Sequence, residues 1–270
     1  MKKTAWYSKA YLFLVYAFLY APILVLIVFS FNKSKSRSVW TGFTFDWYTK
    51  LFHNELILNA LLNTLIIAAV SSVIATVLGT AAAIGINNLN KWMKGVVLNV
   101  TYLPVINPEI VTGVSLMLLF IMLRVEFGYS TLILAHISFN VPYVILNVLP
   151  KLRQMDKFVY EAALDLGCGP LRAFTKAVIP EIMPGIISGF LMAFTYSLDD
   201  FIISYFNSGP QAQTLPIAIY SMTRRKVSPE VNALSTIIFV VVLFVLLLVN
   251  LNDARREKSL RRREGGGSYR

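Results

Sequence analysis

Three acidic residues lie within apolar stretches of this 270-residue chain. Glu109 belongs to the segment LPVINPEIVTG, and Asp199 and Asp200 belong to YSLDDFIIS. A carboxylate in the middle of a bilayer costs about 2.5–3.5 kcal/mol on insertion scales, so such groups usually face a cavity or a partner. Neighbouring residues of a helix point about 100° apart. We therefore expect one aspartate to line a polar path, and the other to cap a helix, form a pair or lie near the outer interface.

Sequence motifs for catalysis or cofactor binding are not evident. The phosphate-binding pattern GxxxxGK[ST] does not occur, and the chain contains no Gly-Lys pair. Cys168 is the single cysteine, and the two histidines, His53 and His136, are far apart in sequence. We find no catalytic triad and no cofactor fingerprint. The chain is therefore expected to be non-catalytic, with no metal or cofactor of its own.

The composition indicates that membrane-spanning helices position these acids. Hydrophobic residues make up 56% of the chain and charged residues only 14%, whereas soluble domains contain about 25% charged residues. A helix that crosses about 30 Å of hydrocarbon needs about 20 apolar residues. The sequence therefore predicts an all-α polytopic membrane protein with six transmembrane helices, at about 10–31, 60–86, 95–123, 129–149, 182–206 and 231–251.

The distribution of basic residues predicts the orientation. The amino-terminal end, 87–94, 151–181 and the tail together hold 17 of the 25 Lys and Arg residues. Because cytoplasmic loops are enriched in Lys and Arg, both termini are expected in the cytoplasm. We divide the chain into a cytoplasmic N-terminus (1–9), a six-helix domain (10–251) and a basic cytoplasmic tail (252–270). The basic tail is expected to meet anionic lipid headgroups and not nucleic acid.

The loop at about 151–185 contains EAALDLGCGPLRAFTKAVIPEIMPG and reads as a helix, a turn and a second helix. Asp156 can cap the first helix, and Gly167 with Gly169 can end it. Pro170 suits the first position of the second helix, and Pro180 with Pro184 is expected to stop or kink it before the next span. Such a unit is either a docking element or a solvated connector.

The same loop resembles the Glu-Ala-Ala loop of permease subunits of ATP-binding-cassette (ABC) importers. Glu161, Ala162, Ala163, Gly167 and Pro180 match that motif, whereas Ala177 and Ile179 stand where Ile and Leu are usual. The segments SLDDFIISYFNSGP and TLPIAIYSMTRRKVSPEVNALST are similar to the polyamine branch, the C-type permease subunits of spermidine/putrescine importers. This resemblance implies the type I ABC importer permease fold and a bacterial plasma (inner) membrane location.

The resemblance also implies partners and site residues. The partners are a second permease subunit, two copies of an ATPase subunit that bind ATP and Mg²⁺, an external binding protein and a polyamine substrate. The loop is expected to form a coupling helix that contacts the ATPase, and the outer segment near 224–226 is expected to contact the binding protein. The expected coupling residues are Phe158, Glu161, Ala162, Ala163, Gly167 and Pro180. Because ammonium groups need carboxylates and are attracted to aromatic faces, the substrate path is expected at Glu109, Asp199, Asp200, Tyr102, Tyr143 and Tyr196. The docking residues are Arg224, Arg225 and Lys226, for which a contact with lipid headgroups is the alternative.

Other interpretations remain open at this point. The permease could serve another small solute, and the sequence does not choose between spermidine and putrescine. A stand-alone channel or secondary transporter is disfavoured, because no internal duplication or filter sequence is evident. Other residues of the spans are expected to serve helix packing: His136 through hydrogen bonds, and Gly79, Gly85, Gly113 and Gly189 through close approach.

Overall fold

The structure is a computed structural model that describes residues 6–34, 39–156, 158–225, 229–241 and 243–244. Helices dominate this part of the chain, and its one β-type contact is an isolated bridge between Asn32 and Phe43. The helices are α1 (Trp6–Ser30), α2 (Asp46–Phe52), α3 (Glu55–Asn87), α4 (Lys91–Ile106), α5 (Glu109–Met122), α6 (Tyr129–Gln154), α7 (Val159–Asp165), α8 (Pro170–Ala173), the π-helical turn η1 (Phe174–Val178), α9 (Ile179–Asp199), α10 (Ile202–Asn207) and α11 (Leu215–Arg225).

Four continuous helices are long and apolar enough to cross a membrane: Trp6–Ser30, Glu55–Asn87, Tyr129–Gln154 and Pro170–Asp199. A fifth candidate is the pair α4 and α5, which bend by 102° at Asn107 and Pro108. The predicted span at 95–123 therefore corresponds to two helices with a sharp bend between them, because Pro108 has no N–H to continue the helical ladder. The predicted span 231–251 is described at 231–241 and 243–244 only, and this part includes a shorter apolar helix, Pro229–Val241.

The chain divides into two compact units, residues 1–55 with 221–270 and residues 56–220. In the first unit, the segment between α1 and α2 folds back on itself. The Trp47 indole N–H donates to the Asn32 carbonyl at 2.7 Å, and the Ser30 and Tyr48 hydroxyls lie 2.7 Å apart. The ring of Phe31 stacks on that of Phe43, with their centroids 5.2 Å apart. These contacts order a turn rich in aromatic side chains.

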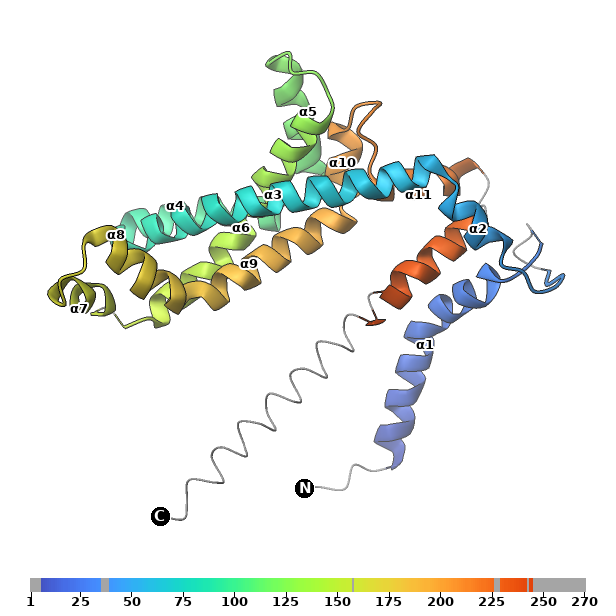
Figure 1. Ribbon diagram of the computed structural model, residues 1–270, viewed down its shortest axis with the longest axis horizontal. Coiled ribbons are helices and arrows are strands. Elements are labelled where there is room, and N and C mark those ends of the chain that lie inside the picture. The colour runs from blue at the N-terminus through green and yellow to red at the C-terminus, as the bar shows by residue number, and fades with distance from the viewer. Residues whose placement is uncertain (1–5, 35–38, 157, 226–228, 242, 245–270) are drawn as a thin grey trace. The chain divides into compact units, whose positions relative to one another are not determined.

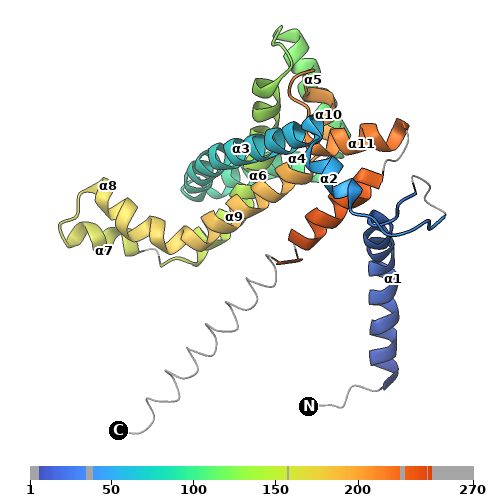
Figure 2. The same cartoon turned by 45° about the vertical axis from the view of Figure 1, so that its right-hand side comes forward.

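The second unit is built around α3, α6 and α9, which Figures 1 and 2 show side by side. Its core includes Ile86 of α3, Val144 and Val148 of α6, and Ile182 of α9. Two of the four glycines predicted to pack closely touch the same residue: a Cβ at Gly79 would lie 2.6 Å from Val144 Cβ, and one at Gly189 would lie 3.2 Å from Val144 Cα.

The other two glycines predicted to pack closely give opposite outcomes. A Cβ at Gly113 of α5 would lie 3.3 Å from Ile203 Cα of α10, so the prediction is confirmed there, and both views show α5 and α10 side by side. No atom of the described chain lies within 4 Å of a Cβ placed at Gly85. The prediction for Gly85 is therefore wrong within this chain, because that face of α3 is not covered by another of its helices.

A break at Asp200 separates α9 from α10. The backbone of Asp200 is extended, with φ −60° and ψ 120°, so the predicted span 182–206 consists of two helices. The Asp200 carboxylate accepts hydrogen bonds from the N–H groups of Ile203 and Ser204, at 3.2 and 2.7 Å. These N–H groups belong to the first turn of α10, where they have no helical partner. The break therefore directs a short helix back against α5.

The 151–185 loop forms the predicted helical hairpin, with α7 and α8 at the end of α9 away from α10 (Figure 1). Gly167 ends α7 with φ 84°, in the left-handed region that glycine tolerates best. Pro170 occupies the beginning of α8, as expected. Pro180 and Pro184 do not stop the helix, because α8, η1 and α9 run on from Pro170 to Asp199. The helix changes direction between α8 and α9 (Figures 1 and 2), which fits the expected kink. Pro180 lies in the first turn of α9, directly after the π-helical turn.

Candidate functional site

A cavity of about 360 Å³ lies where α4, α5, α6, α9 and α10 approach one another. The bend between α4 and α5 and the break between α9 and α10 both contribute to its wall. Straight helices would place more backbone and side chains in this space, so the two interruptions open it. The lining residues are Pro104, Glu109, Thr112, Phe139, Tyr143, Tyr196, Asp199, Asp200, Phe201, Ile202 and Ile203.

All three acidic residues singled out from the sequence line this cavity. Glu109 is the first residue of α5, and Asp199 is the last residue of α9. Both are exposed, whereas Asp200 is buried, with 9% of its surface accessible. Both aspartates reach the wall because the helix ends between them, so the 100° rotation expected within a helix does not apply. Asp200 in addition holds the first turn of α10, one of the roles that the sequence allowed.

Two of the three predicted tyrosines also line the cavity. The rings of Tyr143 on α6 and Tyr196 on α9 have centroids 4.5 Å apart and an interplanar angle of 39°. Aromatic faces attract cations, best when the ring lies within about 6 Å. Tyr102, on α4, is 40% exposed and is not among the residues that line the cavity. The wall therefore combines carboxylates with aromatic rings.

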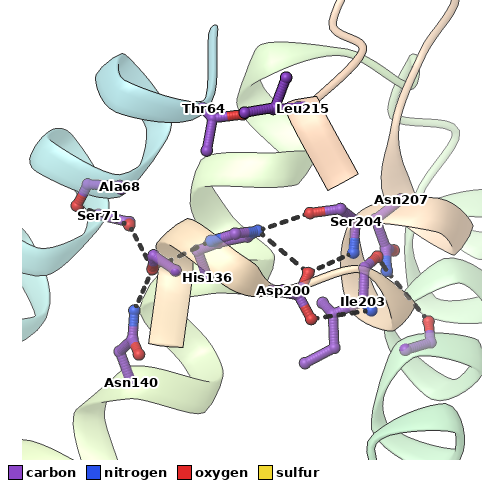
Figure 3. Close-up of polar contacts among 12 residues, drawn as sticks. Thr64, Ala68, Ser71, His136, Asn140, Asp200, Ile203, Ser204, Asn207 and Leu215 are labelled. Atoms are coloured by element: carbon purple, nitrogen blue, oxygen red, sulfur yellow. Dashed lines mark hydrogen bonds and ion pairs between the residues drawn. The ribbon is translucent and has the colours of Figure 1, made fainter. Parts of the chain in front are cut away.

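Behind the cavity, Asp200 contacts a buried histidine (Figure 3). The Nε2 atom of His136 lies 3.5 Å from Asp200 Oδ2 and 3.1 Å from Ser204 Oγ. His136 has no accessible surface, which confirms that it is a packing residue satisfied by hydrogen bonds. A buried polar group without partners would be costly, so these contacts stabilise the corner between α9 and α10.

The same network continues away from the cavity through residues that the sequence analysis missed. His136 Nδ1 lies 3.1 Å from Ser197 Oγ, and the Asn140 amide donates to that oxygen at 2.7 Å. Ser71 of α3 lies 3.3 Å from the same oxygen. A signal was present in the sequence, because His136 and Asn140 are four residues apart and so share one face of a helix.

The residues predicted to contact an ATPase lie together in the hairpin. The side chains of Phe158, Glu161, Ala162 and Pro180 and the backbone of Gly167 are exposed, and Ala163 is half-buried. Two apolar side chains that were not predicted as contacts are more exposed than Phe158, which is 68% exposed: Leu166 at 86% and Leu171 at 76%. Exposed apolar side chains grouped in a short segment are typical of an interaction surface.

The predicted docking residues are only partly described. Arg224 is exposed near the end of α11, and Arg225 is its last residue. Lys226 lies outside the described residues. The part of the chain that the structure describes holds no group of three or more His, Cys, Asp or Glu residues that could bind a metal ion.

Comparison with known families gives one match over most of the chain. Residues 75–258 match the family described as "Binding-protein-dependent transport system inner membrane component". This range includes α4 to α11, and therefore every residue that lines the cavity and the whole hairpin.

Curated relatives match nearly end to end. The chain is 37% identical to the spermidine/putrescine transport system permease protein PotC of Haemophilus influenzae, over 90% of this chain and 95% of the relative. It is 41% identical to the putrescine transport system permease protein PotI of Escherichia coli strain K12, over 92% of this chain and 90% of the relative.

Solved structures share the fold at low sequence identity. A crystal structure of a bacterial ABC transporter involved in the import of the acidic polysaccharide alginate matches with a TM-score of 0.68 at 19% identity. The match covers 93% of this chain and 94% of that chain. A second structure contains the alginate transporter in complex with an alginate pentasaccharide-bound periplasmic protein, and matches with a TM-score of 0.67. At this level of identity the likeness extends to the fold alone.

Proposed function

Because this chain belongs to the family of inner membrane components of binding-protein-dependent transport systems, we propose that it is the permease subunit of an ATP-driven polyamine importer. Membership makes it an inner membrane permease, and the polyamine substrate is our inference. Among the relatives named above, the name of PotC states spermidine/putrescine transport, and the name of PotI states putrescine transport. The observation that carries the proposal is the cavity wall, where Glu109 and Asp199 are exposed beside the pair Tyr143 and Tyr196.

The chemistry of this wall suits a polyamine. A polyamine is a flexible chain of ammonium groups, which lose hydration when they enter a space with low dielectric constant. A carboxylate can replace that hydration with a charge-assisted hydrogen bond, and an aromatic face adds a weaker attraction. Glu109 on α5 and Asp199 on α9 lie on different helices, so they can serve two ammonium groups of one molecule. A neutral or anionic solute would leave these carboxylates without compensation.

We assign ATP hydrolysis to a partner subunit, because the chain contains no phosphate-binding loop. The expected assembly contains this chain, a sister permease, two ATPase subunits and an external binding protein. The hairpin of α7 and α8, with its exposed Leu166 and Leu171, supplies a surface for the ATPase. The segment at 224–226 is proposed to contact the binding protein, with both termini of the chain in the cytoplasm.

Reconstitution into vesicles tests this function. The complete assembly should concentrate radiolabelled putrescine or spermidine only when ATP and the binding protein are both supplied. Unlabelled polyamine should compete with the label, whereas an equal concentration of a neutral diol of the same length should not. This chain alone should neither hydrolyse ATP nor concentrate polyamine. Uphill uptake by the isolated chain, or uptake of the diol in preference to the diamine, would reject the proposal.

A further inference from the structure

The two neighbouring aspartates at the end of α9 differ in their surroundings. Asp199 is exposed, whereas the Asp200 side chain retains only 4% of its accessible surface. Oδ1 of Asp200 accepts from the Ile203 N–H at 3.2 Å, and Oδ2 accepts from the Ser204 N–H at 2.7 Å. Both oxygens of Asp200 are therefore engaged within the chain, so a cation in the cavity would have to compete with backbone donors for them.

We propose that His136 is a positioning residue for substrate passage, which holds Asp200 at the corner of α9 and α10 and so leaves Asp199 to meet the cationic substrate. The inference deepens the proposed function and rests on it for the nature of the substrate. His136 does not line the cavity, and it acts through Asp200. His136 is ionisable and buried, and the proposed function by itself assigns no role to it.

The hydrogen-bond partners determine where the imidazole proton lies. A carboxylate only accepts hydrogen bonds, so a ring nitrogen 3.5 Å from Asp200 Oδ2 is favourable only when it carries a proton. We therefore assign the proton to Nε2, which also lies 3.1 Å from Ser204 Oγ. In a neutral ring, Nδ1 then accepts, and its partner at 3.1 Å is the Ser197 hydroxyl. A neutral imidazole thus satisfies the contacts on both of its sides.

The direction of donation continues through Ser197. Its oxygen accepts from the Asn140 amide at 2.7 Å, and we assign its own proton to His136 Nδ1 at 3.1 Å, which is nearer than the Ser71 hydroxyl at 3.3 Å. Donation therefore runs one way, from Asn140 to Ser197 and to His136, whose Nε2–H lies between Ser204 Oγ and the Asp200 carboxylate. We call Asn140, Ser197, His136 and Asp200 the corner relay. Asn140 and His136 belong to α6, and Ser197 belongs to α9, so the relay links the two core helices to the beginning of α10.

The consequence for the cavity follows from chain geometry. Asp199 and Asp200 are joined by one peptide bond, so the inward side chain of Asp200 sets the direction of the backbone that carries Asp199. If the corner relay is broken, the first turn of α10 keeps its bonds to Asp200, but that carboxylate is no longer fixed to α6. We therefore expect Asp199 to be presented to the cavity less consistently, with no change in the spans themselves.

The test uses the complete transporter in vesicles, with His136→Leu, Asp200→Asn, Asp199→Asn and two double variants. His136→Leu should leave the amount of assembled complex unchanged and lower polyamine uptake roughly tenfold, with more ATP consumed per molecule imported. The double variant with His136→Leu and Asp200→Asn should import polyamine no more slowly than the poorer of the two single variants, because both changes break the same contact between His136 and Asp200. When His136→Leu is combined with Asp199→Asn, the losses should multiply. Thr76→Val is the matched control, since that buried hydroxyl bonds only to the Ser72 carbonyl of its own helix.

Several results would overturn the inference. Loss of assembled complex in proportion to lost uptake would mean that His136 serves folding alone. Multiplying effects of His136→Leu and Asp200→Asn would mean that the two side chains act separately. Equal losses from Asp200→Asn and Asp199→Asn would make Asp200 a direct substrate ligand.

A second measurement does not depend on the substrate or on His136→Leu. Cysteine is placed at Asp199 in a Cys168→Ser background, and a soluble thiol reagent measures its exposure. Ser197→Ala, which removes one hydroxyl of the corner relay, should change the labelling rate several-fold. An unchanged rate would reject the positioning role even in a transporter that imported no polyamine, whereas failed polyamine import with a changed rate would reject only the proposed function.

Discussion

The corner between α9 and α10 buries polar side chains, whereas the hairpin of α7 and α8 exposes apolar ones. Both arrangements carry a cost in free energy. At the corner, His136, Asp200 and Ser197 are polar and almost fully buried. In the hairpin, Leu166 and Leu171 are apolar and largely exposed. The corner offsets its cost within the chain, because the side chains of His136, Asp200 and Ser197 all have polar partners there. The hairpin does not, so we expect its partner to be another subunit.

This difference teaches how to read each region. A closed set of partners indicates that a residue supports the geometry of a site, and the exposed residues beside it are the ones to assign to a ligand. Outside the predicted spans, where lipid does not cover them, exposed apolar groups in a short segment indicate an interface. Glu109 and Asp199 therefore face a ligand by our proposal, and Leu166 and Leu171 face a protein. The following predictions test this division, from the largest expected effect to the smallest.

The largest effect should come from removing charge in the cavity. Asp199→Asn and Glu109→Gln each keep the shape of the side chain but remove one carboxylate. Loss of one partner of a desolvated charge pair costs about 2 kcal/mol or more, or roughly 30-fold in uptake. Uptake of labelled polyamine measures it, with assembly checked by purification of the complex. Thr112→Val, a neutral change in the same wall, is the control, and a loss of equal size there would contradict the role of charge.

Packing density provides the second contrast. Gly79→Ala adds a methyl group that would meet Val144 in the core, and overpacking of this kind costs about 1–3 kcal/mol. Gly85→Ala, on the same helix, meets no atom of the described chain within 4 Å. Thermal unfolding of the purified protein should therefore show a lower midpoint for Gly79→Ala only. Equal unfolding midpoints for Gly79→Ala and Gly85→Ala would mean that α3 and α6 pack less tightly than the short distance between Gly79 and Val144 indicates.

The hairpin turn offers a comparison between two glycines that both face open space. Gly167 has φ 84° and Gly169 has φ −63°, and a Cβ at either one meets no described atom within 4 Å. Gly167→Val should strain the turn by about 1–2 kcal/mol and lower ATP-coupled uptake, because a branched residue disfavours the left-handed region. Gly169→Val should be mild, and Gly167→Asn should recover most of the uptake, since Asn tolerates this conformation. Equal defects in both Val variants would point to crowding at a partner instead.

The smallest effect should come from one exposed apolar contact. Leu171→Ser removes apolar surface from the hairpin and should weaken the ATPase contact by about 1 kcal/mol, roughly fivefold in affinity. Co-purification of the ATPase subunit as a function of its concentration measures this change. Thr175→Ala is the neighbouring control, because the Thr175 hydroxyl bonds to the Leu171 carbonyl of its own helix. An unaltered affinity in Leu171→Ser would leave the hairpin as a connector.

The sequence predicted those features that depend on local chemistry. Apolar runs located the long helices, Gly167 marked the left-handed turn, and costly carboxylates marked the cavity wall. It did not predict the break at Asp200, because the segment SLDDFIIS is apolar enough to continue a helix. At the break, the buried Asp200 contacts His136, which lies more than 60 residues away in the sequence. Long-range partners of this kind are not visible in hydropathy or spacing.

The single helix from Pro170 to Asp199 joins the two regions mechanically. Its 30 residues span about 45 Å at about 1.5 Å per residue. One end carries the exposed surface of the hairpin, and the other ends at the acidic side chain that meets the cavity (Figure 1). Because the helix is continuous, the hairpin and the acidic end of α9 belong to one element, and a partner that moved the hairpin would act on the cavity wall through it. The π-helical turn η1 and Pro180 lie between the two ends, so any bending of the helix on such a movement is expected there.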